Sequence, residues 1–248
     1  DLFHPLVAIG LAFSATSAIN YLFEGRQKDR VKRTFQQYVS AKVVDKILTN
    51  PDAVAMAGER KTITIFFMDF AGFTTLSETL DPVALVELIT QYNNAAVEEI
   101  FLTEGTLDKF IGDCVMAFWG DPIDQTDHAA RACKSAVNIQ NRLQELAAEL
   151  RKQGLPEITA RIGLNTGAAV AGNMGSKYQF NYTVIGSDVN LASRLEGVNK
   201  EFGTRIIISE ATWQEAREAV EVRELTRIQV KGQTQGVRIF ELLGEKGK

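Results

Sequence analysis

Apolar and polar positions follow two different periods along most of the chain. Short apolar runs of strand length are separated by longer segments in which apolar residues recur every three or four positions, as on one face of a helix. These patterns predict strands at 62–68, 106–110, 114–119 and 159–166, and helices at 82–103 and 127–152. The order strand, helix, strand, strand, helix, strand is that of the ferredoxin-like βαββαβ unit.

The two predicted helices have clear end signals. Asp81 stands at the N-cap of the first helix and Pro82 at its first position, where the missing N–H has no partner to lose. The second helix stops at Gly154 and Pro156. The apolar stripes consist of Leu85, Ile89, Tyr92, Ala96 and Ile100 in the first helix, and of Ala132, Ala136, Ile139, Leu143, Leu146 and Leu150 in the second.

Two aspartates stand beside the predicted strands. Asp69 follows the apolar run 63–68, and Asp113 follows Gly112 and precedes the run 114–119. Either one alone is better explained as a turn residue that caps a strand. In a ferredoxin-like sheet, however, the first and third strands are antiparallel neighbours, so we expect Asp69 and Asp113 to face each other. Two facing carboxylates can hold Mg²⁺ ions against phosphates, which suits phosphoryl-transfer chemistry.

The composition argues against several other functions. The formal net charge of −4 does not suit general nucleic-acid affinity, which requires a basic face. The only two histidines, His4 and His128, are far apart, which excludes a histidine-rich metal site and argues against Ser-His or Cys-His nucleophilic catalysis. Cys114 and Cys133 have no metal-type neighbours and are expected to be small core residues in a reducing compartment.

The N-terminal segment differs in kind from the rest. Residues 2–23 carry no charged side chain and are long enough to cross a bilayer as a helix of about 20 residues. Five basic residues against two acidic ones follow in 24–33, so the positive-inside rule places the C-terminal side in the cytoplasm. The alternative is a buried or interfacial helix, because four polar residues dilute the hydrophobicity. A cleaved signal peptide fits poorly, since the charges follow the apolar run. We expect a transmembrane helix over 1–23 in the inner or plasma membrane, with the catalytic domain in the cytoplasm.

Residues 24–57 are interpreted as a juxtamembrane helix and a transducer. Their apolar residues could form the stripe of an amphipathic helix that pairs with its copy in a second chain. The globular part is expected over 58–248, about 190 residues, which is enough for one domain with a well-buried core. Because the chain begins at Asp1 and not at methionine, more protein is expected upstream.

The second half of the chain adds candidate binding residues. A strand and turn are predicted at 181–186 and a helix at 187–195, on which Asn190 and Arg194 are four apart and share one face. A hairpin near the C-terminus carries Lys231. Each of these polar residues alone would be read as ordinary surface, and they become informative only together.

Together, these segments resemble the catalytic domain of the class III nucleotidyl cyclases, the family of adenylyl and guanylyl cyclases. The resemblance covers about 62–242 and rests on six ordered motifs, at 67–74, 109–113, 165–167 with 171–173, 182–186, 189–196 and 230–232. It implies an α/β fold of the α+β kind, a ferredoxin-like βαββαβ palm with a C-terminal extension. The segment 35–39 resembles the short transducer ahead of such domains, and the membrane helix before it resembles that of bacterial receptor cyclases.

The resemblance implies a two-metal site. Asp69 and Asp113 would bind two Mg²⁺ or Mn²⁺ ions, of which one would lower the pKa of the ribose 3′-hydroxyl and the other would neutralise the triphosphate. A loop that opens toward a helix would hold phosphate oxygens with its backbone N–H groups. This loop comprises Phe70, Ala71, Gly72, Phe73 and Thr74.

The resemblance also assigns roles in the second half. Asn190 would orient the ribose, and Arg194 would stabilise the charge that builds on the α-phosphoryl group. Lys231 would hold the departing phosphates. The product would be a cyclic 3′,5′-nucleotide plus pyrophosphate.

The choice of base is implied by Lys109 and Thr183. In the family, Lys with Asp or Thr reads adenine, whereas Glu with Cys or a similar residue reads guanine. Lys can donate to the adenine N1 acceptor, and a Thr oxygen can accept from the exocyclic amine. ATP is therefore the expected substrate, with a guanylyl cyclase as the alternative. Thr in place of the commoner Asp is typical of the subset that includes bicarbonate-responsive cyclases.

The family arrangement also implies a head-to-tail homodimer with two composite active sites. The metal aspartates come from one protomer, and the base, ribose and phosphate residues come from the other: Lys109, Thr183, Asn190, Arg194 and Lys231. Two rival functions are a non-catalytic nucleotide-sensing domain and a diguanylate cyclase. The first would lack some of these residues, and the second would carry a Gly-Gly-Asp/Glu-Glu-Phe hairpin where this chain has 111–114, Ile-Gly-Asp-Cys.

Overall fold

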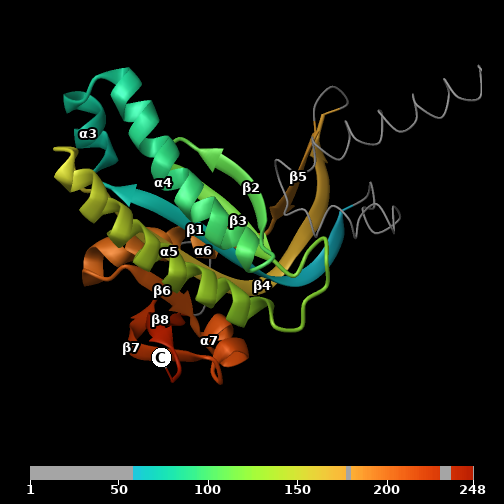
Figure 1. Cartoon of the computed structure of the whole chain (residues 1–248). Helices are drawn as coiled ribbons and strands as arrows, with labels where there is room; N and C mark the ends of the chain where they lie inside the picture. Colours follow the sequence, from blue (N-terminus) through green and yellow to red (C-terminus); the bar gives the residue numbers. More distant parts are fainter. Residues whose placement is uncertain (1–57, 177–179, 230–235, 248) are drawn as a thin grey trace, which may run out of the picture. The chain divides into compact units, whose positions relative to one another are not determined.

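The structure is a computed structural model that describes residues 58–176, 180–229 and 236–247 (Figure 1). The predicted membrane helix at 1–23 and the predicted transducer at 24–57 lie outside the described residues. Among the helices that the structure describes, none is long and apolar enough to cross a membrane. The elements are β1 (Glu59–Ala71), α3 (Phe73–Thr79), α4 (Pro82–Leu102), β2 (Thr106–Ile111), β3 (Cys114–Trp119), α5 (His128–Lys152), β4 (Thr159–Gly175), β5 (Phe180–Ile185), α6 (Ser187–Phe202), β6 (Ile206–Ser209), α7 (Glu210–Ala216), β7 (Val220–Ile228) and β8 (Val237–Glu245).

One sheet of eight strands organises the described part of the chain. Its order is β2-β3-β1-β4-β6-β8-β7, and β5 pairs with β4. β1 lies between β3 and β4 and is antiparallel to both. The order β2-β3-β1-β4 confirms the predicted ferredoxin-like unit, because α4 and α5 each connect two strands that are separated by a third. The strands β6, β7 and β8 form the C-terminal extension.

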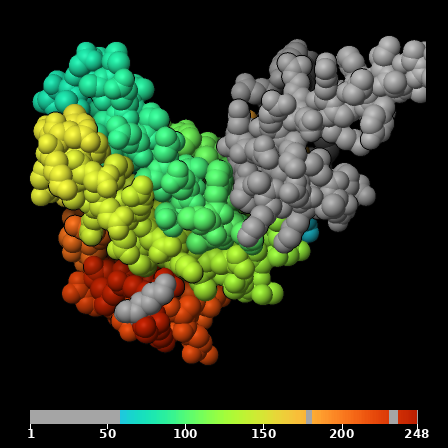
Figure 2. Space-filling model, viewed as in Figure 1, coloured from blue at the N-terminus to red at the C-terminus, as the bar shows by residue number. Residues whose placement is uncertain are grey.

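Helices α4 and α5 pack side by side over one face of the sheet (Figure 1). Figure 2 shows them together on this side of the molecule, with the C-terminal elements in orange and red beside α5. The predicted cap of α4 is confirmed, since the Asp81 carboxylate accepts from the N–H groups of Val83 at 3.0 Å and Ala84 at 3.3 Å.

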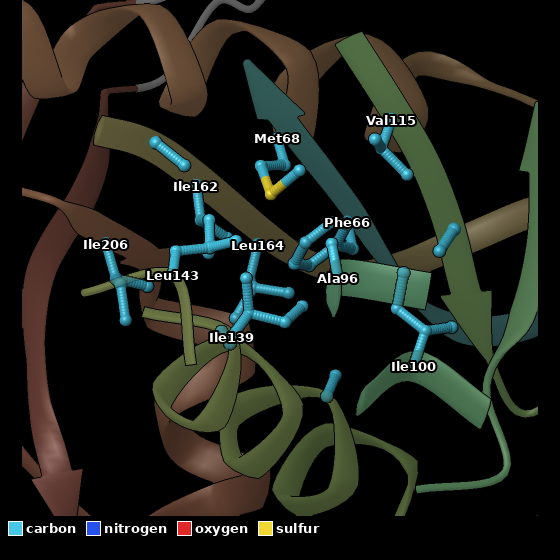
Figure 3. Packing of buried hydrophobic residues seen from close by; sticks show 14 of the residues in the cluster. Phe66, Met68, Ala96, Ile100, Val115, Ile139, Leu143, Ile162, Leu164 and Ile206 are labelled. Carbon is cyan, nitrogen blue, oxygen red and sulfur yellow. The ribbon is translucent and has the colours of Figure 1, made fainter. Parts of the chain in front are cut away.

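The core under these helices takes every second residue of β1. Phe66, Met68 and Phe70 point into it, where Ile139 and Leu143 of α5 meet them (Figure 3). A second cluster lies on the opposite face and takes the alternate residues of β1, together with residues of β5 and α6. Asp69 belongs to this second set, so the alternation directs its carboxylate to the face that α6 covers.

Helix α6 lies against the backbone of β4. A Cβ atom at Gly163 would overlap with the Glu196 amide and the Ala192 carbonyl, and one at Gly167 would overlap with the Asp188 carboxylate. That carboxylate accepts from the Ala168 N–H at 3.1 Å and fixes the start of α6 on the strand. Only glycine allows this approach, so the two glycines determine how close α6 sits to the sheet.

Two elements extend beyond what the sequence predicted. The strand predicted at 159–166 runs nine residues further, to Gly175, because its second half pairs with both β1 and β5. Small residues fill this half, so the sequence lacks the apolar alternation that marks a strand. For the short helix α3, the sequence indicated only that the loop at 70–74 opens toward a helix, and the seven residues of α3 bury no side chain fully.

Candidate functional site

The pairing of β1 with β3 brings Asp69 and Asp113 together. Met68 lies opposite Val115, so the residues that follow on β1 meet the turn that precedes β3. Burial raises the pKa of Asp113, and the charge of Asp69 and a hydrogen bond to it raise that pKa further. Two carboxyl groups this close favour any cation that can lie between them.

Arg161 and Glu196 complete this group, and sequence reasoning missed both. Arg161 on β4 is paired with Asp69 in the sheet register, and its Nη2 donates to Asp69 Oδ2 at 2.7 Å. Its Nε lies 3.0 Å from Oε1 of Glu196 on α6. Burial and the charge of Asp69 raise the pKa of Glu196 to about 7, although Arg161 opposes the shift. The available signal was that Arg161 is the single charged residue within an apolar strand pattern.

Both cysteines are free thiols. Cys133 is buried in the core, as predicted. Cys114 is only partly buried and lies near the acidic residues Asp69, Asp113 and Glu196. Burial raises the pKa of each to about 12, and for Cys114 the charges of Asp69 and Glu196 add to the effect. Such thiols stay protonated at neutral pH, which suits packing and not nucleophilic chemistry.

The predicted phosphate loop divides into two parts in the structure. Phe70 and Ala71 belong to β1, and the Phe70 ring packs in the core against Tyr92, with 5.8 Å between the ring centroids. Gly72 then adopts a left-handed conformation with φ 81°, and α3 begins at Phe73. In the part of the chain that the structure describes, no side chain caps this helix start. The first N–H groups of a helix have no partner within the helix, so the backbone donors of the predicted loop lie at its second part, Gly72–Thr74.

The structure brings Lys109 and Thr183 into contact. Lys109 lies on β2 and Thr183 on β5, and the Lys109 Nζ donates to Thr183 Oγ1 at 3.0 Å. Thr183 is buried, whereas the Lys109 side chain is 39% exposed. A donor and a hydroxyl oxygen thus meet at a partly open position.

Asn190 and Arg194 lie exposed on α6, on the same face as predicted. Glu196 comes two residues after Arg194, a rotation of roughly 200° about the helix axis. Since Glu196 faces Arg161 and the carboxylates, Arg194 is directed away from that group in its own chain. Lys231, predicted to hold phosphates, lies outside the described residues.

These features can be compared with known proteins. A family described as "Adenylate and Guanylate cyclase catalytic domain" matches residues 55–244. The chain belongs to this family. Adenylate cyclase 1 of Rhizobium meliloti is 36% identical over 211 residues, which are 85% of this chain and 32% of that protein. This class III cyclase domain therefore spans about a third of that relative's length.

Two solved structures are similar to this cyclase domain. The adenylyl cyclase CyaB from P. aeruginosa has 36% identity and a TM-score of 0.70, with 75% of this chain and 95% of that chain covered. The guanylyl cyclase Cya2 has 35% identity and a TM-score of 0.72, with 77% and 96% covered. Because an adenylyl and a guanylyl cyclase are almost equally similar, the base must be inferred from individual residues.

Class III cyclases use divalent metal ions, and the carboxylates of this domain fit part of such a site. Asp69 and Asp113 offer hard oxygen ligands side by side, but the described ranges contain no group of three or more His, Cys, Asp or Glu that could hold a metal. Mg²⁺ is usually held by one or two carboxylates together with substrate phosphates. The donor set therefore suits ions that bind together with a triphosphate.

The first prediction concerns Asp113. In the presence of 3′-deoxy-ATP, which cannot cyclise, adding Mn²⁺ to the wild-type domain should raise its melting temperature; at ten times Kd the added stability is about 1.4 kcal/mol. Asp113→Asn should abolish this rise, because one of the two facing carboxylates is lost. The metal-free variant should melt no lower than the wild type, since burial and Asp69 already disfavour the ionised form of Asp113.

Differential scanning fluorimetry with and without Mn²⁺ measures both effects. Glu218→Gln is the matched control, because it removes one acidic charge from a side chain that is 87% exposed. An unchanged Mn²⁺ response in Asp113→Asn would contradict the metal assignment.

Proposed function

We propose that this domain is an adenylyl cyclase that converts ATP to 3′,5′-cyclic AMP and pyrophosphate, at composite sites between the subunits of a head-to-tail homodimer. The observation that carries the choice of ATP is the 3.0 Å contact between Lys109 and Thr183. The Lys109 ammonium can only donate, which suits the adenine N1 lone pair. Guanine carries a proton on N1, so the same ammonium would face a donor.

The reaction is an attack of the ribose 3′-oxygen on the α-phosphorus. A bond from O3′ to phosphorus forms, the bond from the α-phosphorus to the bridging oxygen breaks, and the 3′-hydroxyl proton is released. The N–H groups of Gly72–Thr74 bind phosphate oxygens, and Arg161 adds a cation beside Asp69 and Glu196. Arg194 stabilises the charge that builds on the α-phosphoryl group, and Asn190 orients the ribose. Two divalent ions at Asp69 and Asp113 would supply Lewis-acid stabilisation of the triphosphate and of the attacking oxygen.

The composite site explains an otherwise awkward arrangement. Arg194 is directed away from the carboxylates of its own chain, yet the reaction needs both groups at one phosphate. A second protomer, related by a two-fold axis, can supply the missing half. Exposed apolar side chains near the base-binding strands offer a surface for such a partner: Phe110, Ile111, Val170 and Ile185.

The second prediction tests the base. The purified chain with Mn²⁺ should release cyclic AMP from ATP in clear preference to cyclic GMP from GTP. The double change Lys109→Glu with Thr183→Cys should lower the ATP-to-GTP ratio of kcat/KM by about tenfold or more, because both hydrogen-bond partners then match guanine. A wild type that cyclises GTP instead would favour the guanylyl cyclase alternative. A wild type that binds nucleotide without turnover would favour a nucleotide-sensing domain.

The third prediction tests the composite site. Asp69→Ala and Arg194→Ala should each be nearly inactive alone, because every site of each homodimer lacks one group. Mixed, they should form heterodimers in which one site is intact, with about half the wild-type activity per heterodimer if the sites act independently.

The structure supplies a matched negative control for this mixture. Arg161 contacts Asp69 within one chain, so both belong to the same half of a site. A mixture of Asp69→Ala with Arg161→Ala should therefore stay inactive even when subunits exchange. Recovery in both mixtures, or in neither, would contradict the shared site.

We also propose that residues 1–23, which lie outside the described residues, anchor the chain in the inner or plasma membrane with the cyclase domain in the cytoplasm. The support is the uncharged run 2–23 and the excess of basic residues that follows it. The fourth prediction is that the chain sediments with membranes at high ionic strength and that deletion of 1–23 releases it. A full chain that stays in the supernatant would contradict the anchor.

A further inference from the structure

A buried carboxylate lies directly behind the two residues that we propose read the base. Asp108 precedes Lys109 on β2, and its side chain is 0% exposed. The Thr183 Oγ1 donates to Asp108 Oδ2 at 2.6 Å, and the Val184 N–H approaches the same oxygen at 3.4 Å. The Lys109 Nζ lies 3.0 Å from Asp108 Oδ1. Asp108 therefore contacts both members of the pair.

An irregularity in the sheet makes this possible. Neighbouring residues of a regular strand point to opposite faces, so Asp108 and Lys109 should not reach the same hydroxyl. The register between β2 and β3 shifts at this place, where Leu107 is paired with Ala117 and Lys109 with Met116. Asp108 is the extra residue of this bulge, and such bulges redirect side chains.

The contacts limit what the Thr183 hydroxyl can do. A hydroxyl has one proton to donate and two lone pairs with which to accept. Asp108 can only accept, so it takes the proton, and Lys109 can only donate, so it occupies one lone pair. The remaining lone pair can accept from a ligand. The Lys109 ammonium in turn donates one N–H to Thr183 and forms an ion pair with Asp108 Oδ1, which leaves it N–H groups for the ligand.

We propose that Asp108 is a positioning residue that determines base specificity. It holds the Thr183 hydroxyl as an acceptor and the Lys109 ammonium in place, so that the pair selects a purine with an amine at position 6 and an unprotonated N1. Without Asp108, the hydroxyl could rotate its proton outward and bind a 6-oxo group. Asp108 is wholly buried and acts through Thr183 and Lys109. This inference rests on the proposed ATP cyclase function.

The chain contains a matched control. Asp121 is also a buried carboxylate, accepts from the hydroxyl of Tyr182 on β5, and pairs with Lys61 Nζ at 2.9 Å. It therefore shares two kinds of partner with Asp108, a hydroxyl and a lysine. Its hydroxyl partner comes one position before Thr183 on the strand, where the side chain points to the other face.

The test compares ATP with inosine triphosphate, which carries a 6-oxo group and a protonated N1. Asp108→Asn should lower the ATP-to-ITP ratio of kcat/KM by about tenfold, mainly through KM for ATP, because the amide can turn its N–H₂ toward Thr183. Asp121→Asn should leave the ratio within about twofold of the wild type, whatever it does to stability. In a Thr183→Ala background, Asp108→Asn should change the ratio less than in the wild type, because only its contact with Lys109 is left. If Asp108→Asn does not give a folded protein, Asp108→Ser serves the same comparison.

The outcomes separate this inference from the proposed function. A wild type that prefers ATP, with an unchanged ratio in Asp108→Asn, overturns the role of Asp108 alone. Equal losses of kcat for ATP and ITP would show a merely structural role and also overturn it. A wild type that cyclises neither nucleotide overturns the proposed function and this inference with it.

Discussion

The direct contact of α6 with the backbone of β4 is the constraint on which the site depends. Gly163 and Gly167 let the helix approach without an intervening side chain, and Asp188 fixes its first turn on the strand. Glu196 consequently reaches Arg161 on one side of α6, while Arg194 is presented on the other. If a side chain at Gly163 or Gly167 moved α6 away from β4 by the width of one methyl group, Glu196 would separate from Arg161. The exposed face of α6 that carries Arg194 would then change its orientation as well.

Charge is compensated in two different ways within a short distance along the hairpin of β2 and β3. The base-binding residues are balanced in charge, since the Asp108 carboxylate forms an ion pair with Lys109 and accepts from the Thr183 hydroxyl. The acidic cluster is not, because Asp69, Asp113 and Glu196 all interact with the one cation of Arg161 among the described residues. The first arrangement suits recognition by fixed donors and acceptors, whereas the second suits the binding of additional cations.

The sequence could predict those features that depend on local patterns or on element order. The cap by Asp81 is local, and the meeting of Asp69 with Asp113 follows from the βαββαβ order. Arg161 and Asp108 could not be assigned in the same way. The contact of Arg161 with Asp69 requires the register between β1 and β4, and the role of Asp108 requires a bulge that no residue pattern announces. The sequence analysis missed the second half of β4 because its residues are mostly small. They allow close packing but do not show the alternation of apolar and polar residues that marks a strand.

Arg161 also bears on how the site behaves between reaction cycles. It supplies a positive charge to Asp69 and to Glu196 from within the fold, so a residue of the chain links these two carboxylates. Many metal sites form only when the metal binds, and folding then limits the exchange of the ion. Here Arg161 compensates two of the acidic residues from within the fold itself. Ions could thus enter with each nucleotide and leave with each pyrophosphate, with no local refolding in between.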